Sequence, residues 1–226
     1  MAGKQEMERR ARARRIVGRL KKMYPKPKSE LNYSTPFQFL AAVVMSAQCT
    51  DKTVNRVTEK LFKKYKTALD FARAKPRVLE KEISSISFFR NKTKAIIASA
   101  KIITNPPPGG FGGNVPRTAE ELQTLPGVAY KTSHVVLGEL FNIYDGIPTD
   151  THVKRFAYRF DLSDNRDLKK ISKDLEALVS KKDWKYVNNG FVLYGRYVCP
   201  AHRHDCAKHP LTVLWPEALD RWPKAK

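Results

Sequence analysis

The chain has 226 residues, 42% of them hydrophobic, which is enough apolar surface to form a core and argues against wholesale disorder. It carries 43 Lys and Arg against 22 Asp and Glu. The resulting net charge of +21 favours a polyanionic partner, most often nucleic acid. Attraction to an anionic membrane surface and simple solubility are the two alternatives that the charge leaves open.

Three cysteines are too few, and odd in number, to suggest a disulfide framework. The amino terminus has neither the apolar core nor the cleavage site of a signal peptide, and no apolar run is long enough to span a bilayer. We therefore expect a soluble, intracellular protein of the cytoplasm or nucleoid that makes no membrane contact.

Apolar residues recur at helical spacing along most of the chain and no segment alternates as a strand does, which predicts an all-α fold. The first predicted helix, residues 8–24, places Ile16 and Leu20 on one face and a belt of Arg and Lys on the other. Such a belt is typical of a solvated helix face or a frayed terminus. The other predicted helices cover residues 37–48, 51–65, 68–73, 77–86, 92–103, 118–124, 132–141, 151–160, 168–178 and 184–194.

Several helix starts carry a chemical signal. Thr35 and Pro36 precede the segment FQFLAAVVMSAQ, which is apolar almost all round and is therefore predicted to form the buried centre of a domain. Asp51 is the predicted N-cap of the next helix. Thr118 and Glu121 have the spacing of a capping box.

The segment LPGVAYK lies between two predicted helices, and its Pro-Gly pair predicts a tight hairpin. Backbone N–H groups at the start of the second helix, with the helix dipole behind them, form a phosphate site that binds the DNA backbone without reading sequence. We therefore predict phosphate contacts from Leu125, Pro126, Gly127, Val128 and Ala129. Taken alone, the hairpin could equally be a purely structural turn.

Lys131 lies in the opening turn of the helix that follows this hairpin. A protonated lysine is a poor nucleophile, but the positive end of the helix dipole and partial burial would both favour the neutral amine. Such an amine can attack the anomeric carbon of a nucleotide and form a Schiff base. Without further context, Lys131 could also be one more surface lysine in a lysine-rich chain.

Asp150 precedes a predicted helix whose apolar face carries Val153, Phe156 and Phe160. Its carboxylate could cap that helix, or it could stabilise positive charge on a sugar as the glycosidic bond breaks. The two roles are compatible with each other.

Five blocks of the chain, in order, resemble the endonuclease III family of the helix-hairpin-helix glycosylase superfamily, from about Leu31 to Cys199. The blocks are LNYSTPFQFLAAVVMSAQCTDKTVN, ISFFRNKTKAI, VPRTAEELQTLPGVAYKTSHVVLGELF, PTDTHVKRFAYRF and YGRYVC. The resemblance implies that Lys131 is the nucleophile and Asp150 the catalytic carboxylate.

The same resemblance implies a two-domain helical fold with the active site in the cleft between the domains. Residues 29–144 would form a six-helix barrel domain that contains the helix-hairpin-helix. Residues 1–28 and 145–226 would form a second helical domain from the two ends of the chain.

The family flips its target base out of the duplex, and protein side chains fill the gap. The matching positions here are Gln48, Phe88 and His152. An aromatic wedge at Phe88 would stack on the bases that it separates, although Phe88 could instead be a core residue beside Phe89. Gln48 could equally cap the buried helix, and His152 could be a surface histidine with satisfied hydrogen bonds.

The family usually holds a [4Fe–4S] centre with the pattern C-x6-C-x2-C-x5-C, and this chain departs from it. The four positions are Cys199, Cys206, His209 and Trp215. Since His209 and Trp215 replace two thiolate ligands, we expect no [4Fe–4S] cluster, and we expect no other cofactor or metal.

A histidine-rich stretch in the same region raises the alternative of a zinc site. It contains His202, His204, Cys206 and His209, but their spacing matches none of the usual structural zinc patterns. We expect instead that apolar side chains pack the corner that a cluster would otherwise organise: Leu211, Leu214 and Trp215.

The hairpin also departs from the family pattern. Ala129 and Tyr130 stand where a glycine and a basic residue are usual, and His134 stands where asparagine is common. These changes bear on DNA affinity and substrate range more than on the reaction itself.

The sequence thus predicts a bifunctional DNA glycosylase/AP lyase of base-excision repair, a monomer that acts on double-stranded DNA containing damaged bases or abasic sites. It would remove oxidised pyrimidines such as thymine glycol and cleave the strand by β-elimination through a Lys131 Schiff base. A non-catalytic DNA-binding module and a monofunctional glycosylase for mismatched bases are the alternatives. The presence of both Lys131 and Asp150 favours the bifunctional enzyme.

Overall fold

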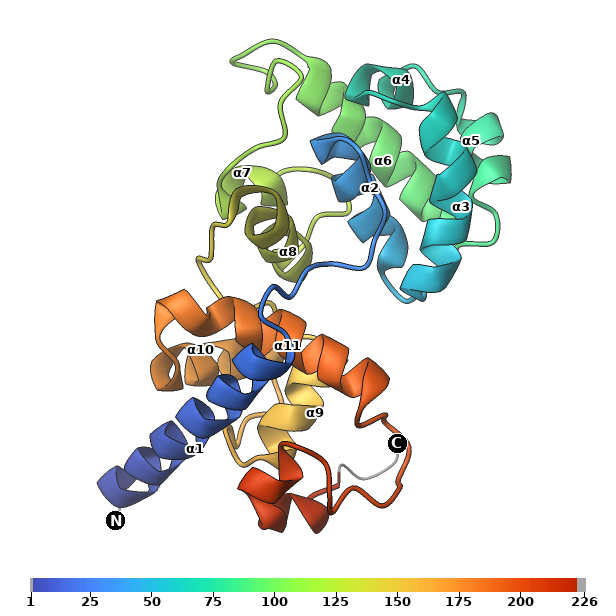
Figure 1. The fold of residues 1–226 in the computed structure, drawn as a ribbon. Helices are drawn as coiled ribbons and strands as arrows, with labels where there is room; N and C mark the ends of the chain where they lie inside the picture. Colours follow the sequence, from blue (N-terminus) through green and yellow to red (C-terminus); the bar gives the residue numbers. More distant parts are fainter. Residues whose placement is uncertain (1, 223–226) are drawn as a thin grey trace. The chain divides into compact units, whose positions relative to one another are not determined.

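A computed structural model describes residues 2–222, and this part of the chain is built of helices without a strand, which confirms the predicted all-α class (Figure 1). The chain divides into two compact units, residues 29–143 and residues 1–28 with 144–226. Each unit has its own hydrophobic core. No helix within residues 2–222 is long and apolar enough to cross a membrane.

The unit of residues 29–143 is formed by one continuous stretch of chain. Its helices are α2 (Pro36–Ser46), α3 (Asp51–Lys64), α4 (Ala68–Ala72), α5 (Pro76–Glu82), α6 (Phe89–Thr104), α7 (Ala119–Gln123) and α8 (Tyr130–Phe141).

Helix α2 is the centre of this unit, as its apolar sequence predicts. Pro36 occupies the first turn, and the Thr35 hydroxyl accepts a 3.3 Å hydrogen bond from the backbone N–H of Gln38. All residues from 37 to 45 are buried, and the helix packs against α3, α6 and α8. A helix with neighbours on every side has no polar face, which explains why its sequence lacks amphipathic periodicity.

The predicted boundaries differ from the structure by a few residues at both the starts and the ends of helices. Thr50, and not Asp51, is the N-cap of α3: its hydroxyl accepts a 3.2 Å hydrogen bond from the N–H of Thr53. Asp51 is the first helical residue, where its charge still complements the positive end of the helix dipole. Thr118 does open α7 as an N-cap, since its hydroxyl accepts from the N–H of Glu121. The Glu121 carboxylate accepts from the Thr118 hydroxyl, whereas a complete capping box has it accept from the Thr118 backbone N–H.

The unit of residues 1–28 and 144–226 is formed from both ends of the chain. Its helices are α1 (Ala2–Met23), α9 (Thr151–Arg159), α10 (Leu168–Leu178) and α11 (Trp184–Tyr197), with 3-10 turns at Lys181–Asp183, Thr212–Leu214 and Pro216–Leu219. Helix α1 packs its fully buried Ile16 and Leu20 within this core, and α11 contacts both α1 and α9. Phe156 of α9 stacks on Phe191 of α11 with 5.2 Å between the ring centroids.

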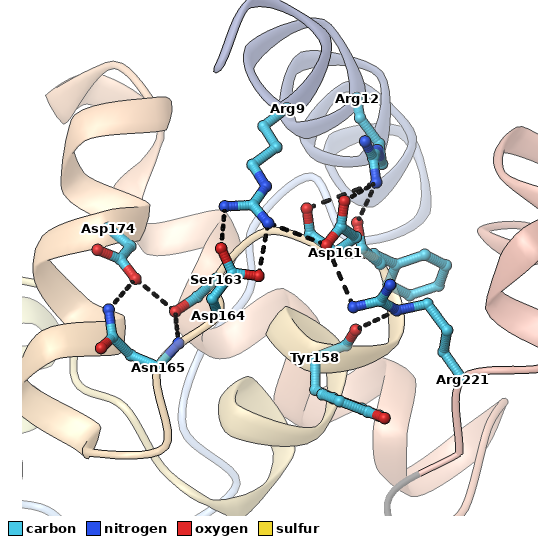
Figure 2. A network of polar contacts seen from close by, with 10 residues as sticks. Arg9, Arg12, Tyr158, Asp161, Ser163, Asp164, Asn165, Asp174 and Arg221 are labelled. Carbon is cyan, nitrogen blue, oxygen red and sulfur yellow. Dashed lines mark hydrogen bonds and ion pairs between the residues drawn. The ribbon is translucent and has the colours of Figure 1, made fainter. Parts of the chain in front are cut away.

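Part of the basic belt on α1 is bound within the fold, so the prediction of a solvated face is wrong for these residues. Figure 2 shows the Asp161 carboxylate accepting hydrogen bonds from Arg9, Arg12 and Arg221, at 3.0, 3.0 and 3.2 Å. Arg9 also binds Asp164 through two nitrogens. The sequence could not reveal this network because Asp161 lies about 150 positions from Arg9 along the chain.

Gly195 of helix α11 lies directly against side chains of helix α9, with no space left for a Cβ atom. A Cβ atom on Gly195 would lie 2.2 Å from His152 Nδ1 and 2.8 Å from an Arg155 terminal nitrogen. Neither distance is compatible with van der Waals contact. The glycine of the YGRY motif therefore makes room for the His152 and Arg155 side chains of α9.

We expect the change Gly195→Ala to lower the free energy of unfolding by about 1–3 kcal/mol, because the new methyl group overpacks the contact with His152. Gly18→Ala on α1 is the matched control, since a Cβ there meets nothing within 4 Å. Better helix propensity should stabilise that variant by up to about 1 kcal/mol. Urea unfolding measures both, and equal effects of the two changes would contradict the packing argument.

Candidate active site

The hairpin between α7 and α8 is held in place by backbone geometry and by contacts with α6. Gly127 has a φ of +79°, and a Cβ there would lie 2.9 Å from the Ala95 Cβ. The Ser99 hydroxyl donates a 2.9 Å hydrogen bond to the Pro126 carbonyl. The predicted turn is therefore present, and it requires glycine for both its φ and its packing.

The predicted phosphate-contact residues divide by burial. Leu125 and Val128 are buried and anchor the hairpin, whereas Gly127 and Ala129 are exposed and Pro126 is half-buried. Ala129 is the N-cap of α8 and supplies no side-chain cap. The first-turn N–H groups of a helix without a capping side chain are a suitable site for an anion.

Lys131 lies in the first turn of α8, where the sequence places it, and it is exposed. The structure therefore contradicts the expectation that partial burial activates this lysine.

Two departures from the family pattern contact each other beside Lys131. The rings of Tyr130 and His134, one helical turn apart, lie with their centroids 4.0 Å from each other. His134 is buried, and its Nδ1 lies 2.8 Å from the Tyr130 carbonyl oxygen. The two residues thus form one tilted ring pair on the first turn of α8.

Asp150 is the N-cap of α9. Its Oδ1 accepts hydrogen bonds from the backbone N–H groups of His152 and Val153, at 2.9 and 3.0 Å. These bonds hold the carboxylate in one orientation, which suits a group that must place negative charge at a fixed point. Capping, one of the two roles that the sequence suggests, is therefore present.

Phe88 and Gln48 share an uncommon conformation. Phe88 precedes α6 with a φ of 57° and is 62% exposed, so it is not the core residue that the sequence left as an alternative. Gln48 follows α2 with a φ of 53° and is also exposed. Exposed, left-handed, non-glycine residues carry backbone strain that is typical of functional positions.

The end of α2, next to Gln48, is capped by a residue that the sequence analysis missed. Lys92 of α6 is buried, and its Nζ donates to the carbonyl oxygens of Met45, at 2.8 Å, and Ala47. Burial lowers the pKa of Lys92 below its usual value. Helical periodicity in the sequence does indicate that Lys92 is buried, because it falls on the same helical face as Ile96 and Ile103.

His152 lies near the start of α9 and is half-buried. Its Nδ1 is 3.4 Å from a terminal nitrogen of Arg155, and its ring faces Gly195 of α11. The histidine is thus held between two helices of its own unit.

The C-terminal segment brings four potential metal ligands together, which does not fit the prediction that the chain has no metal or cofactor. The ligand atoms of Cys199, His204, Cys206 and His209 all lie within 4.8 Å of one another. The prediction was wrong because it relied on the family spacing, in which Trp215 is the fourth position. His204, from the segment between the two cysteines, joins the group instead.

The apolar packing expected near these four residues is present as well. Leu211 is fully buried, and Leu214 and Trp215 pack against the same core. Trp215 also lies under the guanidinium of Arg12, 4.2 Å from the ring centroid. The corner therefore combines a packed tryptophan with a group of potential metal ligands.

The sequence of this chain is similar to those of known DNA repair proteins. The model of the HhH-GPD superfamily base excision DNA repair proteins matches residues 41–181. Endonuclease III of a Synechocystis species is 41% identical over 210 residues, which are 93% of this chain and 94% of that protein. Endonuclease III of Bacillus subtilis is 40% identical, over 88% of this chain and 89% of the relative.

Solved structures of endonuclease III are also similar to this chain. A trapped endonuclease III–DNA covalent intermediate has a TM-score of 0.84 and 35% identity, over 94% of this chain and 98% of that one. A thermostable thymine-DNA glycosylase, with a TM-score of 0.76 but 20% identity, shares the fold. The chain belongs to the HhH-GPD superfamily of base-excision DNA repair proteins and, within it, to the endonuclease III family of DNA glycosylase/AP lyase enzymes.

Proposed function

We propose that the chain excises oxidised pyrimidines such as thymine glycol from double-stranded DNA and then cleaves the abasic strand through a Schiff base on Lys131. The observation that carries the proposal is an exposed lysine in the first turn of α8, directly after the hairpin. A structural relative at 35% identity is a covalent intermediate of endonuclease III with DNA, which supports a protein nucleophile.

Binding to DNA would rest on charge and on the hairpin. The net charge of +21 attracts the duplex, and the N-terminus of α8 offers backbone N–H groups to one phosphate. Phe88 and Gln48 are exposed and held by strained backbone, which suits residues that fill the gap left by a flipped base.

The reaction would begin when the neutral Lys131 amine attacks C1′ of the damaged nucleotide. The C1′–N bond breaks, and the base leaves with a proton. The Asp150 carboxylate stabilises the positive charge that develops on the sugar during this step. The amine and the opened sugar then form a protonated imine.

Strand cleavage follows from the imine. Loss of a proton from C2′ expels the 3′ phosphate by β-elimination, and water then hydrolyses the imine and returns the Lys131 amine. No external oxidant or reductant is needed, because each step only moves protons and electron pairs.

Borohydride trapping on a duplex with one abasic site tests the nucleophile. We expect the native protein to give a covalent protein–DNA adduct and Lys131→Gln to reduce its yield by roughly 100-fold or more, since the attacking amine is gone. Lys101→Gln is the control, because it removes the same charge from an exposed position of the same unit. An equal adduct from Lys131→Gln would mean that another amine attacks.

The same assay separates the remaining functions. Excision of thymine glycol without a trapped adduct would indicate a monofunctional glycosylase. Binding to the damaged duplex without excision or adduct would indicate a DNA-binding module. Either result would overturn the lyase proposal.

Asp150→Asn separates the capping role of Asp150 from its charge. Asparagine caps helices about as well as aspartate, so the free energy of unfolding should fall by less than about 1 kcal/mol. Loss of the negative charge should slow thymine glycol excision by roughly 100-fold or more. Single-turnover excision and urea unfolding measure the two effects, and an unchanged excision rate would assign Asp150 to capping alone.

Phe88→Ala tests the wedge. Because Phe88 is exposed, stability should change by less than about 0.5 kcal/mol, while affinity for a duplex with a stable abasic analogue should fall roughly tenfold through lost stacking. The neighbouring Phe89 packs against the core, so Phe89→Ala should instead destabilise the protein by about 2 kcal/mol. Unchanged DNA affinity in Phe88→Ala would argue against a wedge.

A further inference from the structure

Four side chains near the carboxyl end form a compact group that the proposed reaction does not use. Cys199 follows α11, and His204, Cys206 and His209 follow within ten positions. Their sulfur and imidazole nitrogen atoms lie within 4.8 Å of one another. Both cysteines are 1% exposed, and both histidines are half-buried.

The two histidines each present a buried nitrogen without a partner. His204 Nε2 and His209 Nδ1 are shielded from solvent and make no hydrogen bond among the described residues. Buried polar atoms are nearly always satisfied, so two such nitrogens in one group indicate a missing ligand.

The tautomer of His204 is fixed in a way that suits metal binding. Its Nδ1 lies 2.7 Å from the His202 carbonyl oxygen, which can only accept, so Nδ1 carries the proton. The lone pair is therefore on Nε2, the buried nitrogen that makes no hydrogen bond among the described residues. Donation of the second ring N–H to a carbonyl is the usual arrangement of a metal-binding histidine.

The sulfur atoms are held by a buried arginine. Arg159 of α9 is fully buried, and its two terminal nitrogens lie 3.0 Å from Cys199 Sγ and 3.1 Å from Cys206 Sγ. No carboxylate of the described residues pairs with this guanidinium. The buried guanidinium therefore holds both sulfur atoms in place within the group.

The backbone of the ligand segment is held as well. Arg155, one turn before Arg159, donates 2.7 Å hydrogen bonds to the carbonyl oxygens of Cys199 and Pro200. Helix α9 thus fixes both the first ligand and the start of the segment that carries the others. The backbone at the start of the ligand segment is therefore held against α9.

The donor set does not fit the [4Fe–4S] cluster of the family. That cluster requires four thiolates, and only two of the group are cysteines. A two-iron cluster with two cysteines and two histidines binds its ligands to different irons, which spreads them over a larger site. Ligands of a single tetrahedral zinc ion, at about 2.3 Å for sulfur and about 2.0 Å for nitrogen, lie within about 4 Å of one another.

We propose that Cys199, His204, Cys206 and His209 bind one zinc ion in the corner where the family carries an iron–sulfur cluster. The ion would link the segment 199–209 to α9 through the contacts of Arg159 with the sulfurs. Its role is structural, because all four ligands come from protein and none of the tetrahedral positions is left for substrate.

Metal analysis of the purified full-length chain, expressed without a histidine tag in medium containing zinc and iron, tests the site. We expect one zinc ion and no iron per chain, with loss of zinc in Cys206→Ser and His209→Gln. His202→Gln is the matched control, because His202 is an exposed histidine of the same segment outside the group, and it should keep one zinc. Cobalt(II) substitution should give the visible bands of tetrahedral coordination in the native protein.

A second measurement covers variants that fold poorly. Zinc added to chelator-treated native protein and to His202→Gln should raise the midpoint of thermal unfolding by several degrees, because the ion binds only the folded state. The midpoint of His209→Gln should not respond. Absence of zinc together with an unresponsive native midpoint, zinc retained in His209→Gln, or stoichiometric iron with broad visible absorption would each overturn the proposal.

Discussion

The hairpin between α7 and α8 passes so close to α6 that residue 127 has no room for a side chain. The positive φ of Gly127 turns the chain at this point, and the Ser99 hydroxyl holds the neighbouring carbonyl. The direction in which α8 begins depends on these contacts. Lys131 and the uncapped N-terminus of α8 are thus placed by packing at a position that takes no part in the chemistry.

At Gln48 and Phe88, too, the residues that hold the backbone differ from the exposed residues that are proposed to contact DNA. Gln48 and Phe88 both have left-handed backbone, which costs free energy in a non-glycine residue. The buried Lys92 offsets part of this cost at Gln48, because it donates to the last carbonyl groups of α2. The strained backbone at Gln48 therefore follows a helix end that is held by a buried side chain. The Phe88 ring stays exposed and does not pack in the core.

In the unit formed by the two ends of the chain, helix α9 has several roles along a single face. Its N-cap is the proposed catalytic carboxylate Asp150, and its second residue, His152, is packed under Gly195. Arg155 and Arg159, further along, hold the proposed zinc ligands. One helix therefore both orients Asp150 and contacts the proposed zinc ligands.

The sequence by itself determined the helical class, most helix positions, the hairpin and the motifs that identify the family, because each depends on residues close together along the chain. Periodicity, capping residues and the Pro-Gly turn are local signals. Tertiary structure alone decided the rest. It paired Arg9 and Arg12 with Asp161, left Lys131 exposed, and brought His204 beside Cys199. The arginine pairs depend on how distant segments pack, and the approach of His204 to Cys199 depends on the path of the short loop between them. Spacing along the chain encodes neither distance.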